Sequence, residues 1–133
     1  MRVVIDTNAL VSALLTPAGL CGQMLDLIVE GILRPCVDER MLAEYEAVLT
    51  DPRFPFTSEQ VDTLLDMLRS AGDRVVALPL AAKLPHECDR PFLEVARAAD
   101  APIVAGNTRH FPKRACKATP VLSPRDVIEG LRG

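Results

Sequence analysis

The stretch from Val3 to Asn8 (VVIDTN) constrains the fold of this chain more than any other. Its three consecutive β-branched residues predict a buried strand, and the polar cluster after them predicts the turn where that strand ends. In a parallel α/β sheet, this turn lies at the edge formed by the carboxyl ends of the strands, where such folds place their chemistry. Asp6 is therefore expected to present a carboxylate there. The alternative is that Asp6 or Asn8 only caps the helix that follows.

Strands and helices are predicted to alternate along the rest of the chain. The predicted strands cover residues 3–5, 32–37, 75–78, 102–105 and 120–122. Helices are predicted over 8–15, from Leu20 to Gly31, from Asp38 to Leu49, from the cap Thr57 to Gly72, over 91–99 and from Ser123 onward. Such alternation predicts one three-layer α/β/α domain, residues 1–133, with a central, mostly parallel sheet. Pro35 lacks a backbone donor, which favours an edge position or a bulge for the second strand.

Composition excludes several classes of protein. A formal net charge of -3 excludes a basic protein that coats nucleic acid, although it leaves room for a local basic patch. No stretch reaches the length of a membrane span, and the amino terminus lacks the pattern of a signal peptide, so we expect a cytoplasmic protein. The four cysteines form no CxxC pair and are expected to be reduced and buried.

Several acidic or amide side chains are predicted to meet at the same edge of the sheet as Asp6. Asn107 follows a later strand, Asp89 precedes a helix, and Glu44 lies in the first turns of the helix after the second strand. Helical periodicity does not decide between Glu44 and Glu46. Converging carboxylates repel each other unless a cation neutralises them, and all-oxygen ligation suits Mg²⁺ or Mn²⁺.

Other kinds of catalytic site are not indicated by the sequence. There is no GxSxG, Walker A or GxGxxG motif. His86 and His110 have no partner at metal-ligand spacing, so both are interpreted as loop histidines rather than ligands. A metal of this kind lowers the pKa of a bound water and stabilises charge on a phosphoryl oxygen, which is the chemistry of a phosphodiesterase.

Four blocks of sequence, in this order and spacing, resemble the PIN-domain family, in particular bacterial PIN proteins described as toxin components of toxin–antitoxin systems. The blocks are 3–8 (VVIDTN), 41–45 (MLAEY) with Val48-Leu49, 89–96 (DRPFLEVA), and 103–107 (IVAGN) with His110-Phe111. The resemblance runs from Arg2 to about Leu131. It implies a Mg²⁺- or Mn²⁺-dependent ribonuclease with a small antitoxin protein as partner, and relatives often form homodimers.

The resemblance also assigns residues to the site. It places Asp6, Glu44 and Asp89 as the three acids that hold the metal, which favours Glu44 over Glu46. Asn107 occupies the place of a fourth acid, and Ala105 stands where Ser or Thr is usual. His86 and Cys88 stand where relatives often have further aspartates, and Glu87 is a weaker candidate to replace the missing charge.

Residues near these acids are candidates to bind RNA. Thr7 and Asn8 could position a phosphate through a side chain or a backbone amide. A basic run next to Asn107 could hold the RNA backbone, although a solvated loop is an equal alternative. The run consists of Arg109, His110, Lys113, Arg114 and Lys117.

Three functions are compared on these residues. The first is a metal-dependent endoribonuclease, in which Asp6, Glu44 and Asp89 hold the cation. The second is a degenerate PIN domain that binds RNA or a protein partner without cleavage, as Ala105 and Asn107 suggest. The third is a phosphatase with Asp6 as nucleophile, similar to haloacid-dehalogenase-like enzymes. It ranks last because that pattern needs Asp at position 8, where this chain has Asn.

Overall fold

The structure is a computed structural model that describes residues 1–132, apart from the side chains of Thr108 and Arg132. Its strands form one five-stranded sheet in the order β3-β2-β1-β4-β5. All four strand pairings are parallel. The strands are β1 (Arg2–Ile5), β2 (Arg34–Val37), β3 (Asp73–Arg74), β4 (Ile103–Val104) and β5 (Val121–Leu122). The predicted α/β class is therefore confirmed.

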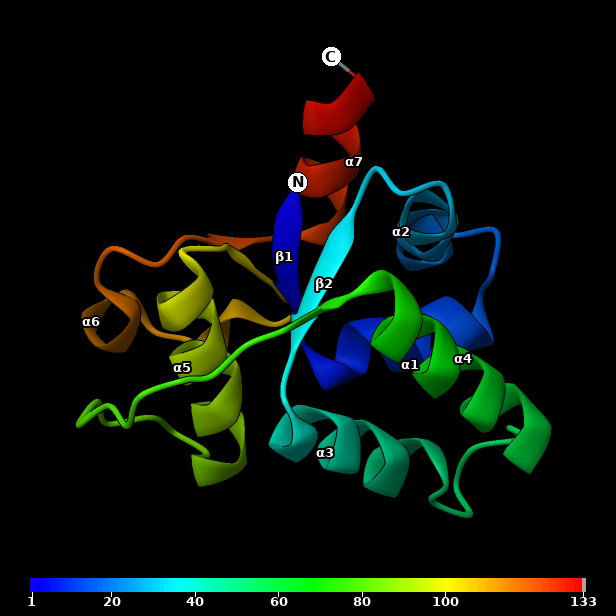
Figure 1. Cartoon of the computed structure of the whole chain (residues 1–133), viewed down its shortest axis with the longest axis horizontal. Helices are drawn as coiled ribbons and strands as arrows, with labels where there is room; N and C mark the ends of the chain where they lie inside the picture. Colours follow the sequence, from blue (N-terminus) through cyan, green and yellow to red (C-terminus); the bar gives the residue numbers. More distant parts are fainter. Residues whose placement is uncertain (133) are drawn as a thin grey trace.

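The helices connect these strands and cover the sheet. They are α1 (Thr7–Leu15), α2 (Leu20–Val29), α3 (Glu39–Leu49), α4 (Ser58–Ala71), α5 (Arg90–Ala99), α6 (Lys113–Cys116) and α7 (Pro124–Arg132), with 3₁₀ turns η1 (Glu87–Asp89) and η2 (Thr108–His110). In Figure 1, α5 lies on one side of β1 and β2, while α1, α2 and α4 lie on the other, which gives three layers.

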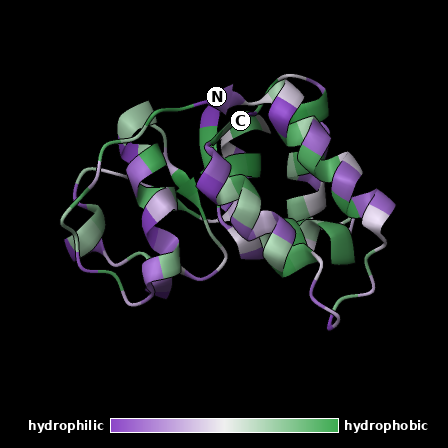
Figure 2. Cartoon of the chain, turned by 60° about the horizontal axis from the view of Figure 1, so that its bottom comes forward, coloured by the Kyte–Doolittle hydropathy of each residue, from purple (hydrophilic) through white to green (hydrophobic). Residues whose placement is uncertain are grey.

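The core is built from aliphatic side chains on the strands and on the inner faces of the helices. Val3, Val4 and Ile5 of β1 are buried, as the run of β-branched residues predicts. Each helix carries both hydrophilic and hydrophobic residues (Figure 2). The capping box predicted at Thr57 and Gln60 is formed, and it fixes the start of α4.

The order of the strands reverses at β1, next to the place where the chemistry is expected. From β1 the chain moves to β2 on one side, and it later returns to β4 on the other side of β1. In open parallel sheets, ligands generally bind at the carboxyl ends of the two strands that flank such a reversal. In Figure 1, α1 and α3 both begin at this end of the sheet. Asp6 directly follows β1, and Asn107 lies three residues after the end of β4.

The predicted strand at residues 75–78 is wrong. The strand is Asp73–Arg74, which pairs with Cys36 and Val37 at the end of β2. The amide of Val75 still donates to the carbonyl of Val37, but β2 ends at Val37, so the residues after Val75 have no partner in β2. The chain then leaves the sheet, and Val76 is 93% exposed. Apolar β-branched residues alone do not reveal that their partner strand stops.

The expected edge position of Pro35 is also wrong, because β2 lies between β1 and β3. Along β2, the backbone amide and carbonyl of successive residues point alternately to the strands on either side. The amide of Arg34 donates to the carbonyl of Met1, on the β1 side, whereas the carbonyl of Val37 accepts from the amide of Val75, on the β3 side. Pro35 therefore turns its nitrogen toward β3, which pairs only from Cys36 onward. The missing donor lies where β2 has no partner strand, so the proline is tolerated.

Two further sequence predictions are tested by the structure. Cys36 and Cys116 are buried and Cys21 is half-buried, but Cys88 is exposed, so the expectation of buried thiols is wrong for Cys88. The predicted basic loop contains two short helical segments, η2 and α6.

No single helix within residues 1–132 is long and apolar enough to cross a membrane. Within the same residues, α1 and α2 together have enough length and apolar character, but the chain bends by 98° between them.

Candidate functional site

Asp6 has the environment expected of a functional acid. Its amide donates to the carbonyl of Val104, which fixes it between β1 and β4, and its carbonyl accepts from the amide of Ala9 in α1. The side chain is only 3% exposed, makes no capping hydrogen bond, and leaves Oδ2 buried without a hydrogen-bond partner. The alternative in which the Asp6 side chain serves only as a helix cap is therefore wrong.

Asp89 is the second buried acid. It ends η1 and occupies the position before α5, yet its side chain makes no capping hydrogen bond. Its Oδ2 atom is also buried and lacks a hydrogen-bond partner; His110 Nδ1 lies 3.5 Å away, within reach of an ion pair but not of a hydrogen bond. Buried polar atoms are normally satisfied, so two orphaned carboxylate oxygens require an explanation.

The two acids act on each other electrostatically. The pKa of Asp6 is raised to about 6, first by burial and then by the negative charge of Asp89. The positive charge of His110 and the amide of Thr7 oppose this shift, and Glu44 adds a smaller increase. Burial also raises the pKa of Asp89, while His110 and His86 act to lower it. Burial of the carboxylate is thus the first cause of both shifts, and it disfavours the charged form of each acid.

Glu44 and Glu46 are distinguished by their surroundings. Glu44 is half-buried in α3 and raises the pKa of both Asp6 and Cys88, whereas Glu46 is exposed. Next to Glu44, the hydroxyl of Tyr45 donates a 2.6 Å hydrogen bond to the carbonyl of Ile5, the residue before Asp6. This bond ties the helix that carries Glu44 to the end of β1.

The remaining predicted residues are less closely joined to the buried acids. Asn107 is exposed, and its side-chain oxygen accepts from the amide of Arg109, as in a turn. Thr7 is buried at the start of α1, while Asn8 is exposed. Arg109 and Lys113 are exposed. Glu87 is held by Arg90 through two hydrogen bonds of 2.7 and 2.8 Å, so its charge is already compensated.

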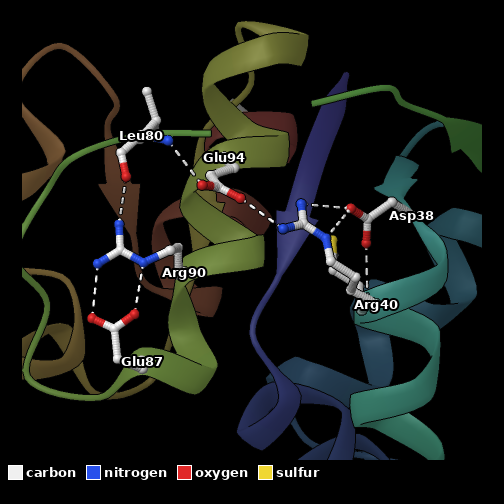
Figure 3. A network of polar contacts seen from close by, with 7 residues as sticks. Asp38, Arg40, Leu80, Glu87, Arg90 and Glu94 are labelled. Carbon is white, nitrogen blue, oxygen red and sulfur yellow. Dashed lines mark hydrogen bonds and ion pairs between the residues drawn. The ribbon is translucent and has the colours of Figure 1, made fainter. Parts of the chain in front are cut away.

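A polar network missed by the sequence analysis joins α3 to α5 (Figure 3). Arg40 in the first turn of α3 contacts Asp38 at 2.8 Å and the buried Glu94 of α5 at 2.7 Å. Glu94 also accepts from the amide of Leu80. Arg90 donates to the carbonyls of Leu80 and Ala82. The network thus holds the segment before Asp89 against α5, and it fixes α5 relative to the helix that carries Glu44.

The sequence indicates this network only through Glu94, an acid among the buried apolar residues of α5.

Arg40→Ala is expected to lower the free energy of unfolding by about 1–2 kcal/mol, because Glu94 would keep a buried charge without its cation. Arg53→Ala is the matched control: its pair with Asp51 is on the surface, and its loss should cost clearly less than the loss of the Arg40 pair. Urea unfolding of both variants measures the difference. Equal losses would show that the Arg40 pair has no special weight.

The donor chemistry of this site fits a divalent cation. Two buried carboxylate oxygens lack partners, and oxygen ligands suit Mg²⁺ and Mn²⁺. As the side chains lie, however, no group of three or more His, Cys, Asp or Glu residues within residues 1–132 is arranged to hold a metal ion. Of the three predicted acids, Asp6 and Asp89 each have a buried oxygen without a partner, whereas Glu44 is only half-buried.

Fold and site together define a parallel α/β domain with two buried acids, Asp6 directly after β1 and Asp89 directly before α5. A family model described as "PIN domain" matches residues 2–109. The chain therefore belongs to the PIN-domain family, whose members are in general nucleases.

One solved structure shows the same fold. This chain superposes with a TM-score of 0.62 on a chain of VapBC2 from Rickettsia felis. That crystal structure holds VapBC2 bound to a DNA fragment from its promoter. The two sequences are 16% identical, and the match covers 92% of this chain and 98% of that chain. No curated protein matches the sequence significantly.

Proposed function

We propose that this protein is a Mg²⁺- or Mn²⁺-dependent endoribonuclease that hydrolyses phosphodiester bonds of RNA. The observation that carries the proposal is the pair of buried, unpartnered carboxylate oxygens on Asp6, directly after β1, and on Asp89, directly before α5. Membership of a family of nucleases supports the reaction class. Two buried acids that repel each other are costly at neutral pH, and a bound cation would compensate their charge.

The residues of the chain have separate roles in this proposal. Asp6 and Asp89 would hold the ion, with Glu44 closing toward it from α3. When bound, the metal supplies a water of lowered pKa and stabilises charge on the phosphoryl oxygen. Tyr45 fixes the end of β1, and the Arg40–Glu94 pair fixes α3 against α5, so that the acids are held before substrate arrives.

A basic hollow on the same domain supports an RNA substrate. It measures about 330 Å³ and lies between the segment 80–83 and the helices α5 and α6. Four of its lining residues are cationic: Lys83, Arg97, Arg114 and Lys117. Arg97 is anchored by its bond to the carbonyl of Cys116. Phosphate groups are the expected occupants of such a surface, and we assign Thr7, Asn8, Arg109, His110 and Lys113 to substrate contacts nearer the acids.

The partners of the protein belong to the same proposal. The fold similarity to a chain of VapBC2 supports a function as the toxin of a toxin–antitoxin pair, with a small antitoxin that covers the surface next to Asp6 and Asp89. We place this activity in the cytoplasm, where RNA is available, and homodimerisation is a further part of the proposal.

One experiment tests the reaction. Purified protein incubated with single-stranded RNA and Mn²⁺ is expected to produce internal cleavage fragments, and EDTA should abolish them. Binding of RNA without cleavage at any concentration of Mn²⁺ would instead support the second candidate, a non-cleaving RNA-binding PIN domain. Two observations favour that candidate: the Asn107 oxygen is occupied by the Arg109 amide, and no three-donor group is preformed within residues 1–132.

A further inference from the structure

The positive charges of this chain are compensated in one part of the domain and left uncompensated in another. Among the described side chains, every arginine outside residues 83–117 lies within ion-pair distance of a carboxylate. Inside that range, Arg90 alone of the described cations has such a partner. The cations without one are Lys83, Arg97, Arg109, Lys113, Arg114 and Lys117. The surface around α5 and α6 therefore carries positive charge in a protein whose net charge is -3.

Two hollows adjoin at the end of α6, which lies beside α5 in Figure 1. One is the basic hollow described above. The other measures about 400 Å³ and is named here the apolar hollow, because much of its lining is apolar: Phe111, Pro112, Pro120 and Val121. Lys117 lines both hollows. They are also joined by a 3.1 Å hydrogen bond, which Arg97 of the basic hollow donates to the hydroxyl of Thr119 in the apolar one.

The apolar hollow contains a backbone donor and acceptor at the open edge of the sheet. Strand β5 is an edge strand and pairs only with β4. The carbonyls of Pro120 and Leu122 accept from β4, so the amide and carbonyl of Val121, the residue between them, point away from β4. An adjacent donor and acceptor beside apolar side chains can bind the edge of an unstacked nucleobase.

The backbone of Lys117 is strained where the two hollows meet. Lys117 has a φ of 51°, which side chains other than glycine and asparagine rarely adopt. Its amide still donates to the carbonyl of Lys113, so this conformation ends α6 and presents the lysine to both hollows. Strained positions of this kind cluster at binding sites.

We propose that the two hollows together bind one nucleotide of a single-stranded RNA, with its phosphate in the basic hollow and its base in the apolar hollow. Arg97 lies eight residues along the chain from Asp89, which in a helix corresponds to about 12 Å. The nucleotide bound here is therefore separate from the one that is cleaved. This inference rests on the proposed function for RNA as the ligand, and it adds a base-contacting site away from the buried acids.

The contribution of the base is tested by comparing two ligands in EDTA, so that no cleavage occurs. Fluorescence anisotropy measures binding of the full chain to a labelled single-stranded RNA and to an abasic strand of the same length. The wild type is expected to bind the RNA at least about fivefold more tightly. Val121→Phe should lose this preference, because the larger side chain fills the apolar hollow, while its affinity for the abasic strand is retained. Circular dichroism checks that the variant is folded.

The contribution of the phosphate is tested by the salt dependence of RNA binding. Arg114→Gln and Lys117→Gln should each lower the slope of log affinity against log salt by about 0.7, because each removes one phosphate contact. Arg69→Gln is the matched control: it makes the same change of charge on α4, where Arg69 pairs with Asp66, and should leave the slope unchanged.

The outcomes separate this inference from the proposed function. Equal affinity of the wild type for the RNA and the abasic strand, or the same slope in all three charge variants, would overturn the inference. Equal affinity for an acidic peptide of the same charge would also overturn it, because the surface would then bind any anion. If Mn²⁺-dependent cleavage persisted in these cases, the proposed function would stand alone. RNA binding as expected here without any cleavage would support the inference and remove the proposed reaction.

Discussion

Asp6→Asn is expected to abolish metal-dependent RNA cleavage, with a loss of at least about a hundredfold in rate, while the protein remains folded. The substitution keeps the shape of the side chain but removes the charge that the cation requires. Because Oδ2 of Asp6 has no hydrogen-bond partner and the side chain makes no capping hydrogen bond, its amide should be accommodated. Cleavage of labelled RNA in Mn²⁺, with circular dichroism of the same sample, measures both effects.

The matched pair Glu44→Gln and Glu46→Gln sharpens this prediction. Both residues lie on α3, two positions apart, but only Glu44 is half-buried and electrostatically coupled to Asp6. Glu44→Gln should reduce cleavage, and Glu46→Gln should leave it at the wild-type rate. Wild-type activity in Asp6→Asn would show that the buried acids take no part in the reaction.

The second large effect is a loss of stability of the metal-free protein as pH rises. Asp6 has an unfolded pKa of about 3.8 and a folded pKa of about 6, so the folded state holds its proton more tightly. The stability from this group is therefore fully present below about pH 4 and is lost as pH rises through about 6. The difference amounts to roughly 3 kcal/mol.

Asp6→Asn provides the control for this effect. Asparagine resembles the protonated acid at every pH, so the variant should exceed the wild type in free energy of unfolding at pH 7 and match it near pH 4. Urea unfolding in the presence of EDTA at both pH values measures this. A variant that is less stable than the wild type at pH 7 would contradict the raised pKa. Together with the first prediction, a gain in stability with a loss of activity would mark Asp6 as a residue retained for function.

Local sequence rules predicted that Asp6 and Asp89 lie close enough to interact, as they do. Strand ends and helix starts placed Asp6 and Asp89 at one edge of a parallel sheet, because backbone geometry there depends on short patterns. The resemblance to the family was needed to prefer Glu44 over Glu46, since periodicity describes only which side of a helix is apolar. The structure gives Glu44 the more buried position.

Features that depend on distant partners were not predictable. Glu94 is buried because Arg40 reaches it from another helix, and His110 lies beside Asp89 because two separate 3₁₀ turns meet. Neither pairing leaves a periodic signal in the sequence. The misplaced third strand has the same origin: its residues favour a strand, but the neighbouring strand ends at Val37.

The central claim is that Asp6 and Asp89 together hold a divalent cation. Calorimetric titration of Mn²⁺ into metal-free wild type, Asp6→Asn and Asp89→Asn at pH 7 tests it most directly. We expect the wild type to bind Mn²⁺ and each variant to lose this binding or weaken it at least about tenfold. Equal binding by all three proteins would contradict the account.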